Sequence, residues 1–233
     1  LVVGNIGAPQ LIRQGEERAL TMDQAEDALD MIDGDFLGIH FNYLQEVCQP
    51  EGDLRAEGVL KSVENIADKI PVIAKETGGG ISSDVAGKLE DAGVKAIDVG
   101  GMGGTSFAAV EHYRAGDDKN IKELSEHLWD WGIPTPISII ECRRKVDIPI
   151  IGTGGIRNGI EAVKALSLGA DIVGTAGGIL PALMKGKKET VEYLEKLIYQ
   201  IKAGLFLLGC KTPKELTQKK VVLTGDLRDW VDI

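Results

Sequence analysis

Cysteine is scarce in this chain of 233 residues, and basic residues are outnumbered by acidic ones. The three cysteines, Cys48, Cys142 and Cys210, are widely spaced and form no CxxC pair. That pattern argues against a zinc site or a disulfide framework and suggests a reducing compartment. Lys and Arg number 26 against 36 Asp and Glu, and the net charge of −10 argues against broad binding of nucleic acid.

Long hydrophobic runs and targeting signals are also missing. The longest apolar stretch near the carboxyl end, residues 205–208, is far too short to span a bilayer. No secretory signal pattern stands at the start. We therefore expect a cytoplasmic protein without membrane contacts. Residues 1–4 resemble a buried strand with no lead-in, so we expect further sequence before them in the whole protein.

The chain does contain a repeated alternation of short apolar runs and amphipathic segments of helical length, which is typical of βα units around a parallel sheet. Thr21 and Ser82 are placed to cap helices, and Gly93 and Gly169 stand where helices should end. The predicted strands are residues 1–4, 35–41, 71–75, 96–99, 149–152 and 171–175, and the predicted helices are residues 22–32, 58–68, 82–92, 136–145 and 159–167.

Two further segments complete this prediction. Residues 100–106 and 113–120 are expected to form a long loop after the fourth strand, a usual place for an active-site lid. A longer amphipathic helix ends the chain, and we expect its apolar face to pack on the outside of the sheet, with an oligomer interface as the alternative for its distal end. The residues of this face are Val191, Leu194, Leu197, Ile198, Ile201, Leu205 and Leu208.

Six βα units favour a particular α/β architecture. A six-stranded arc would leave two open edges, whereas an eight-stranded barrel has none. We therefore expect one domain over residues 1–233, a (β/α)8 or TIM barrel of which the chain supplies strands 3 to 8.

Polar or glycine-rich residues follow all six predicted strands, where barrel enzymes carry their catalytic groups. Two of these segments, residues 152–159 and 171–178, are rich in glycine and predict a phosphate site, because a side chain would hold the backbone away from the phosphate. Lys75 could neutralise charge on a bound cofactor or form an ion pair with Asp98.

Residues 40–46 place four polar side chains directly after a strand. His40 could be a neutral hydrogen-bond donor or a cation facing a diphosphate, and Glu46 could hold Mg²⁺. Each could also be a satisfied core residue, but their concentration favours function. His112 and His127 lie in charged surroundings and are expected to face solvent, and the cysteines are expected to fill space.

Together these motifs resemble the type 2 isopentenyl-diphosphate isomerases in order and spacing over nearly the whole chain. The matching segments are HFNYLQE (40–46), QPEGD (49–53), PVIAKETGGGIS (71–82), AIDVGGMGGTSF (96–107) and GTGGIRNG (152–159). The HxNxxQE segment is specific to that family, while GTGGIR and the strand lysine are shared with other FMN barrels. The family's RKxxH segment, which binds the diphosphate, is expected in the preceding part of the protein.

The resemblance implies interconversion of isopentenyl and dimethylallyl diphosphate with reduced FMN, Mg²⁺ and NADPH as reductant, in a tetramer or octamer. It implies that Gln45 is catalytic and contacts the substrate, that His40 and Asn42 bind the diphosphate, and that Glu46 binds the metal. The implied FMN-binding residues are Asn5, Lys75, Gly104, Thr105, Gly154, Gly155, Arg157, Ala176 and Gly177.

Other interpretations stay open. A hydroxy-acid oxidase needs a His followed by an Arg near the last loops, and no His follows His127. An inosinate dehydrogenase needs a nucleophilic cysteine on a loop, and neither Cys142 nor Cys210 stands at a strand end. A flavin-binding segment without activity is the remaining alternative.

Overall fold

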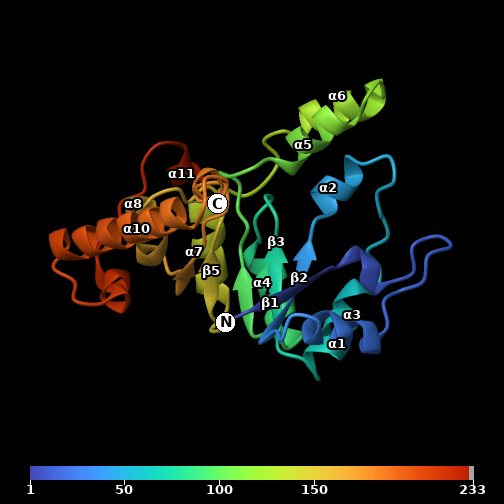
Figure 1. Ribbon diagram of the computed structural model, residues 1–233, viewed down its shortest axis with the longest axis horizontal. Coiled ribbons are helices and arrows are strands. Elements are labelled where there is room, and N and C mark those ends of the chain that lie inside the picture. Colours follow the sequence, from blue (N-terminus) through green and yellow to red (C-terminus); the bar gives the residue numbers. More distant parts are fainter. Residues whose placement is uncertain (231–233) are drawn as a thin grey trace.

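Six parallel strands form the sheet at the centre of the computed structural model, which describes residues 1–230 (Figure 1). The strands lie side by side in chain order: β1 (Val3–Gly7), β2 (Phe36–Phe41), β3 (Val72–Glu76), β4 (Ala96–Asp98), β5 (Ile150–Gly152) and β6 (Ile172–Val173). Every neighbouring pair is parallel, so each connection must cross over, and helices supply these crossovers. The predicted α/β alternation is confirmed.

The helices occupy the connections that the alternation predicts. After β1 come η1 (Pro9–Leu11) and α1 (Met22–Asp30); after β2, α2 (Tyr43–Val47) and α3 (Val59–Ala67); after β3, α4 (Ser83–Asp91); after β4, α5 (Phe107–Arg114), α6 (Lys119–His127) and α7 (Thr135–Lys145); after β5, α8 (Gly159–Ser167); and after β6, α9 (Leu180–Leu183), α10 (Lys187–Leu207), η2 (Pro213–Gln218) and α11 (Asp226–Asp229).

Side chains of the expected type begin and end these helices. The Thr21 hydroxyl accepts from the Gln24 amide, and the Gln24 side chain accepts from the Thr21 amide, a reciprocal capping box at the start of α1. The Ser82 hydroxyl caps α4 by accepting from the Val85 amide. Gly93 and Gly169 follow α4 and α8 with φ of +85° and +116°, which glycine adopts without steric cost.

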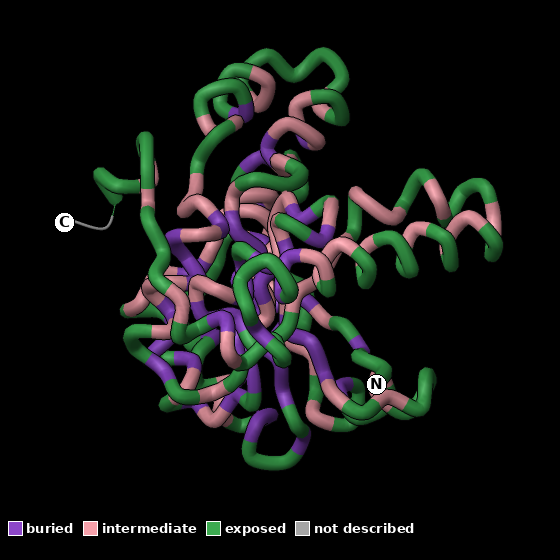
Figure 2. The backbone as a smooth tube through the Cα atoms, turned by 90° about the vertical axis from the view of Figure 1, so that its left-hand side faces the viewer, coloured by how far each residue is buried: buried purple, intermediate pink, exposed green. Residues whose placement is uncertain are grey.

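The core lies where strands and helices meet, and Figure 2 shows the buried residues gathered at the centre of the molecule. Alternate residues of a strand point to opposite faces, and in a parallel sheet covered on both faces nearly all of them are apolar. The core includes Leu37, Ile39, Val72, Ile97, Ile150, Val63, Leu89, Ile139 and Ala162. Cys48, Cys142 and Cys210 are all buried and free, as expected for residues that fill space.

The long loop expected after β4 is only partly correct. Residues 100–106 and 115–118 lie outside helices, but residues 113–114 and 119–120 are helical. Two helices, α5 and α6, form a hairpin that projects from the body (Figure 1), and only a short turn separates them. Ser106 caps α5, and Asp118 caps α6 by accepting from the two amides that follow Lys119. These caps lie among residues that also favour turns, so the sequence pattern did not separate the two outcomes.

His112 also departs from the prediction. It lies on α5 with only 18% of its side chain exposed, and its ring makes an edge contact with Trp129 at a centroid distance of 5.6 Å. Its burial follows from the α5–α6 hairpin that was predicted as loop. His127, at the end of α6, is exposed as expected.

The long helix α10 packs on α8, but most of its apolar face is not covered. Gly204 and Leu205 are buried, whereas Val191, Leu194 and Ile198 are 44%, 40% and 49% exposed. The expectation that the whole face packs on the sheet exterior is therefore wrong for the first half of the helix. No helix within residues 1–230 combines the length and the apolar character needed to cross a membrane.

Candidate active site

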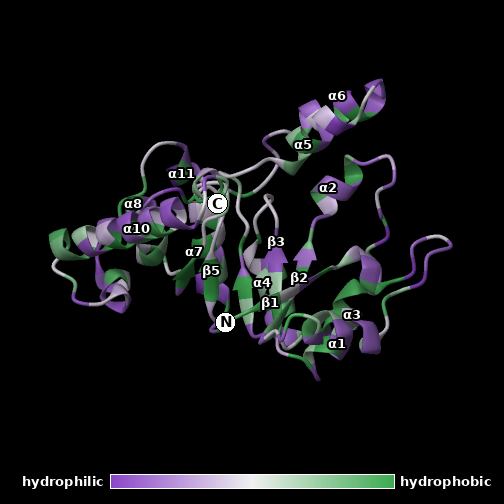
Figure 3. Cartoon of the chain, in the orientation of Figure 1, coloured by the Kyte–Doolittle hydropathy of each residue, from purple (hydrophilic) through white to green (hydrophobic). Residues whose placement is uncertain are grey.

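The carboxyl ends of β2, β3 and β4 bring three ionisable residues together. The register places His40 opposite Lys75 and Lys75 opposite Asp98. Figure 3 shows the ends of β2 and β3 as hydrophilic, in contrast to the apolar strand interiors. Lys75 Nζ lies 3.2 Å from Asp98 Oδ2, and the Thr153 hydroxyl donates to the other oxygen of Asp98. The ion pair left open by the sequence therefore exists, and Lys75 still lines a cavity.

That cavity has a volume of about 580 Å³ and lies among the loops that follow β3, β4, β5 and β6. Its size suits a small-molecule cofactor. Eight of the nine residues predicted to bind FMN line it: Lys75, Gly104, Thr105, Gly154, Gly155, Arg157, Ala176 and Gly177. The loops of four strands thus converge on one space.

Close contact between two loops explains the glycines at its wall. Gly155 has φ of +81°, and a Cβ there would lie 2.2 Å from the carbonyl oxygen of Gly103. Gly154 has φ of +104° and would meet the Gly101 oxygen at 2.1 Å. Arg157 fastens the same loops by donating to the carbonyls of Gly155 and Gly103, both at 3.0 Å. The two loops therefore leave no room for side chains at Gly154 and Gly155. The exposed backbone amides that result are typical of a phosphate-binding loop.

The start of α8 contributes less to this cradle than the glycines do. Asn158 Oδ1 accepts from the amides of Ile160 and Glu161, each at 3.0 Å. The Gly159 amide donates to Gln200 of α10. Because these donors of the first turn already have partners, an anion would be held by the glycine-rich segments before the helix.

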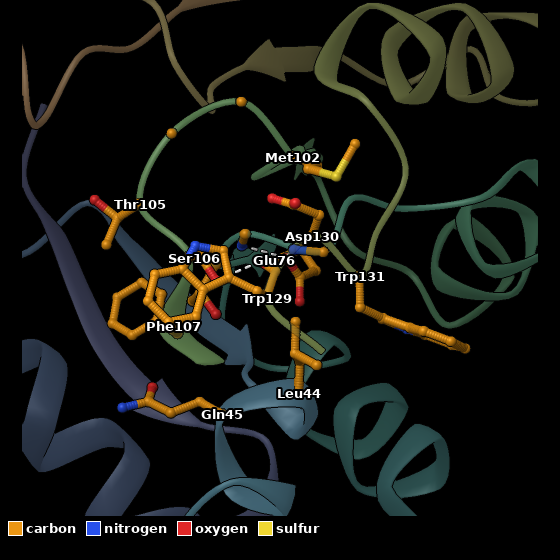
Figure 4. Close-up of a pocket in the computed structure, with 15 residues that line it drawn as sticks. Leu44, Gln45, Glu76, Met102, Thr105, Ser106, Phe107, Trp129, Asp130 and Trp131 are labelled. Atoms are coloured by element: carbon orange, nitrogen blue, oxygen red, sulfur yellow. Dashed lines mark hydrogen bonds between the residues drawn. The ribbon is translucent and has the colours of Figure 1, made fainter. Parts of the chain in front are cut away.

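A second cavity, of about 380 Å³, adjoins the first and shares Gly104, Thr105 and Phe107 with it. Leu44 and Gln45, from α2, lie on one side of this space, opposite Ser106 and Phe107 (Figure 4). A molecule bound here would therefore touch both Gln45 and anything held in the larger cavity. Residues 43–47, which follow β2, form the short helix α2, and Gln45 of this helix lines the cavity.

The amide of Gln45 is held by a carboxylate that sequence reasoning missed. Gln45 Nε2 donates to Glu111 Oε1 at 2.7 Å, and Gln49 Nε2 donates to the same oxygen at 3.0 Å. Glu111 lies on α5 and is only 2% exposed. Glu111 follows Ala108 by three positions, so both lie on the buried face of α5, a helix that was not predicted. This spacing is the one feature of the sequence that could have indicated its burial.

Asn42 and Glu46 form a buried polar pair at the start of α2, and each is 6% exposed. Asn42 Nδ2 donates to Glu46 Oε1 at 2.6 Å, and the Asp53 amide donates to Glu46 Oε2 at 2.8 Å. Asn42 Oδ1 is buried without a hydrogen-bond partner. An unpaired amide oxygen beside a carboxylate suits Mg²⁺, which takes one or two protein carboxylates and completes its shell with phosphate and water.

The side chains of residues 1–230 do not by themselves enclose a metal at this point. Among residues 1–230, no group of three or more His, Cys, Asp or Glu side chains is arranged to hold an ion. Glu46 therefore fits a partial magnesium site, in which most ligands would come from a phosphate-bearing molecule and water.

His40 and Asn5 face one another rather than the larger cavity. Asn5 Nδ2 lies 3.1 Å from His40 Nδ1. Burial, the largest influence, and the charge of Lys75 lower the pKa of His40 below its ordinary value, against a backbone hydrogen bond at Ile6 and the charge of Glu46. Of the two forms considered for His40, this structure favours the neutral one. Asn5 lies within β1, which runs on to Gly7, and not after it as expected.

Comparisons of the sequence identify related proteins. The family model described as FMN-dependent dehydrogenase matches residues 44–223. The chain is 44% identical to an isopentenyl-diphosphate delta-isomerase of Thermoplasma volcanium, over 99% of this chain and 66% of that protein. It is 45% identical to the enzyme of the same name from Archaeoglobus fulgidus, over 99% of this chain and 65% of that protein. The chain thus spans slightly less than two thirds of the length of these relatives.

Solved structures share the fold at low sequence identity. GMP reductase from Trypanosoma brucei superimposes with a TM-score of 0.60 at 21% identity, covering 95% of this chain and 46% of that chain. A mandelate oxidase superimposes with a TM-score of 0.60 at 22% identity, covering 87% and 58%. These likenesses show the fold alone, in which six parallel strands correspond to part of a (β/α)8 barrel.

Proposed function

The chain belongs to the family of FMN-dependent dehydrogenases, and on that basis we propose that it supplies most of the active site of an isomerase that interconverts isopentenyl and dimethylallyl diphosphate. The observation that carries the proposal is the position of Gln45, in a cavity that opens onto eight residues predicted to bind FMN. Relatives of that name are about 44% identical over nearly the whole chain, which supports the same conclusion.

The reaction moves a double bond by adding a proton at one carbon and removing one from another, with no net change of oxidation state. When bound and reduced, FMN supplies an electron-rich ring that stabilises positive charge and exchanges a proton. Lys75 offsets negative charge at the edge of that ring. Gln45 presents its carbonyl oxygen to the substrate, because its NH₂ group is bound to Glu111.

The diphosphate would lie over the start of α2. Asn42 would help to bind the diphosphate, and the Glu46 carboxylate, with the unpaired Asn42 oxygen beside it, would hold Mg²⁺, which would offset the negative charge of the diphosphate. Neutral His40, with Nδ1 facing the Asn5 amide, would carry its hydrogen on Nε2 and donate it to a phosphate oxygen when the diphosphate binds. Asn5 therefore supports the tautomer of His40 and has no contact with the flavin cavity in this proposal.

The remaining features of the proposal concern the whole protein. Residues 1–233 belong to one FMN-binding domain of a cytoplasmic homo-oligomer, a tetramer or octamer. NADPH supplies the electrons that reduce FMN before turnover. No partner other than the small diphosphate and further copies of the chain is required.

One assay tests the proposal. The whole protein is incubated without oxygen with FMN, NADPH, Mg²⁺ and isopentenyl diphosphate, and dimethylallyl diphosphate is followed by chromatography with mass detection. We expect product only when the flavin is reduced, and omission of NADPH serves as the control. An absence of product from a preparation that binds FMN stoichiometrically would contradict the isomerase.

An FMN-dependent oxidoreductase is the second candidate, because the matching family model is that of dehydrogenases. Cys142, which would have to serve as the nucleophile in one such reaction, is buried in α7, and burial raises its pKa to about 12. A thiol with that pKa supplies almost no thiolate at neutral pH. Oxidation of a hydroxy acid by the same preparation would favour this candidate.

A further inference from the structure

We propose that Arg114 is a positioning residue for Gln45, acting through the carboxylate of Glu111; the role is meaningful only if the site has the function proposed above. Arg114 is the last residue of α5, one helical turn after Glu111. It touches neither of the two cavities. Its influence on the reaction would therefore pass through the side chains that join α5 to α2.

The contacts form a continuous chain from Arg114 to the cavity. Arg114 Nη1 lies 2.8 Å from both oxygens of Glu111. Glu111 Oε1 accepts in turn from Gln45 Nε2 at 2.7 Å and from Gln49 Nε2 at 3.0 Å. Gln45 lies in α2, and Gln49 lies just after the end of that helix. Glu111 is thus an acceptor that these three donors share.

Every partner of Glu111 in this chain of contacts is a donor. A carboxylate accepts at both oxygens, so its ionised form satisfies all four hydrogen bonds. A protonated Glu111 would have to donate, and a proton on either oxygen would face an N–H group. Either that contact would break or a glutamine amide would rotate by half a turn. Rotation of Gln45 would put its NH₂ group where its carbonyl oxygen now faces the cavity.

Arg114 is one of the groups that favour the ionised form of Glu111. Burial, the largest influence, raises the pKa of Glu111, but hydrogen bonds from Gln45, Gln49 and Arg114, together with the charge of Arg114, lower it overall. Arg114 is the only one of these three donors that carries a charge. Two other ionisable groups lie close to this contact. Glu51, 3.7 Å from Arg114, carries the opposite charge, and Cys48, the residue after α2, is a buried thiol.

The sign of the pH dependence follows. A carboxylate whose folded pKa is lowered keeps its hydrogen-bonded arrangement above its ordinary pKa and loses it as pH falls through the folded pKa. Without Arg114, only the hydrogen bonds from Gln45 and Gln49 still offset the burial of Glu111, and we expect the pKa of Glu111 to rise. The Gln45 amide would then lose its fixed orientation at a higher pH than in the unmodified protein.

The test compares the dependence of kcat on pH for Arg114→Met, Arg114→Lys and the unmodified enzyme, with reduced FMN and saturating isopentenyl diphosphate. For Arg114→Met we expect the acidic limb to move to higher pH, with kcat near pH 6 falling roughly tenfold below its own plateau while KM changes about twofold or less. Arg114→Lys should restore most of the loss, and kcat at alkaline pH should return close to normal in all three. A uniformly damaged structure would lower kcat at every pH instead.

Glu111→Gln and Arg144→Met complete the series. Glu111→Gln should lower kcat at every pH and remove the acidic limb. Arg144 is an exposed arginine in the last turn of α7, and its replacement should leave the profile unchanged.

A second readout does not depend on turnover. The carboxyl carbon of Glu111, assigned by its loss in Glu111→Gln, is titrated by NMR in the FMN-loaded protein, and we expect its midpoint to rise in Arg114→Met. An unmodified enzyme that forms no product overturns the proposed function, yet this titration still shows whether Arg114 governs Glu111. Superimposable pH profiles, or an unchanged Glu111 midpoint, overturn the positioning role.

Discussion

Gln45 contributes an amide to the smaller cavity and little to the packing of α2. A substitution at Gln45 can therefore change the reaction without changing the fold. Replacement by Ala removes the carbonyl oxygen that faces the substrate but none of the residues that line the larger cavity. We expect Gln45→Ala to bind FMN normally and to lose roughly 100-fold or more in turnover, the usual contribution of a proton-transfer group. Flavin absorbance during titration and the rate of product formation measure the two effects separately.

Gln49→Ala is the matched control for this prediction. Gln49 donates to the same oxygen of Glu111 but does not line the cavity. Its loss should therefore slow the reaction much less than the loss of Gln45. Near-normal turnover of Gln45→Ala would show that the catalytic assignment is wrong.

For single residues, the sequence was a good guide to the glycines of the loops and a poor guide to which side chains contact one another. Gly154 and Gly155 could be predicted because a glycine pair after a parallel strand has few other uses. Glu111 could not, because its importance depends on burial against α2, 66 residues earlier in the chain. A single acidic residue in a helical segment carries no sign of which neighbour it will meet.

Among the elements, α8 and α10 depend on two glycines for their close approach. A Cβ at Gly159, the first residue of α8, would lie 2.5 Å from the Leu197 carbonyl oxygen, and a Cβ at Gly204 of α10 would lie 2.8 Å from Val163. The first contact involves backbone, which cannot move aside as a side chain can. We expect Gly159→Ala to lower the free energy of unfolding by about 1–3 kcal/mol, the usual cost of overpacking.

Urea denaturation measures this effect, with Gly87→Ala as control. Gly87 lies inside α4, and an added Cβ there would meet only the flexible side chain of Lys145. Since Ala favours a helix interior by about 1 kcal/mol over Gly, that variant should be as stable as the unmodified protein or more so. Equal stability of Gly159→Ala and the unmodified protein would mean that α10 shifts easily on α8.

Helices with a strong apolar period and a clear cap were predictable as elements. The range predicted for α8 agrees with the structure, and α1 and α4 begin after the capping residues expected for them. The helices α2, α5 and α6 were not predicted, because they are short and their capping residues also favour turns. Gln45 lies in α2, and Glu111 and Arg114 lie in α5, so two of the three missed helices belong to the site itself.

For the whole molecule, the order of the sheet followed from the prediction of a (β/α)8 barrel, because successive strands of such a barrel lie beside one another in chain order. The exposure of α10 did not follow. An amphipathic pattern states that a face can be buried, but not which segment covers it. Val191, Leu194 and Ile198 have the expected spacing and are nevertheless substantially exposed.

FMN should stabilise the molecule as a whole, because the cavity of about 580 Å³ joins the loops after β3, β4, β5 and β6. A ligand that binds only the folded state at 100 times its Kd adds about 2.7 kcal/mol, which for a chain of this size corresponds to a rise in Tm of roughly 5–10 °C. Gly155→Glu should abolish this rise, since its Cβ would lie 2.2 Å from Gly103 and its carboxylate would repel a phosphate. Thermal unfolding at increasing FMN concentrations measures the effect.

Gly116→Ala is the control, because Gly116 also has a positive φ but open space around it, so the variant should keep the full FMN-dependent rise. A normal response of Gly155→Glu to FMN would place the cofactor elsewhere in the molecule.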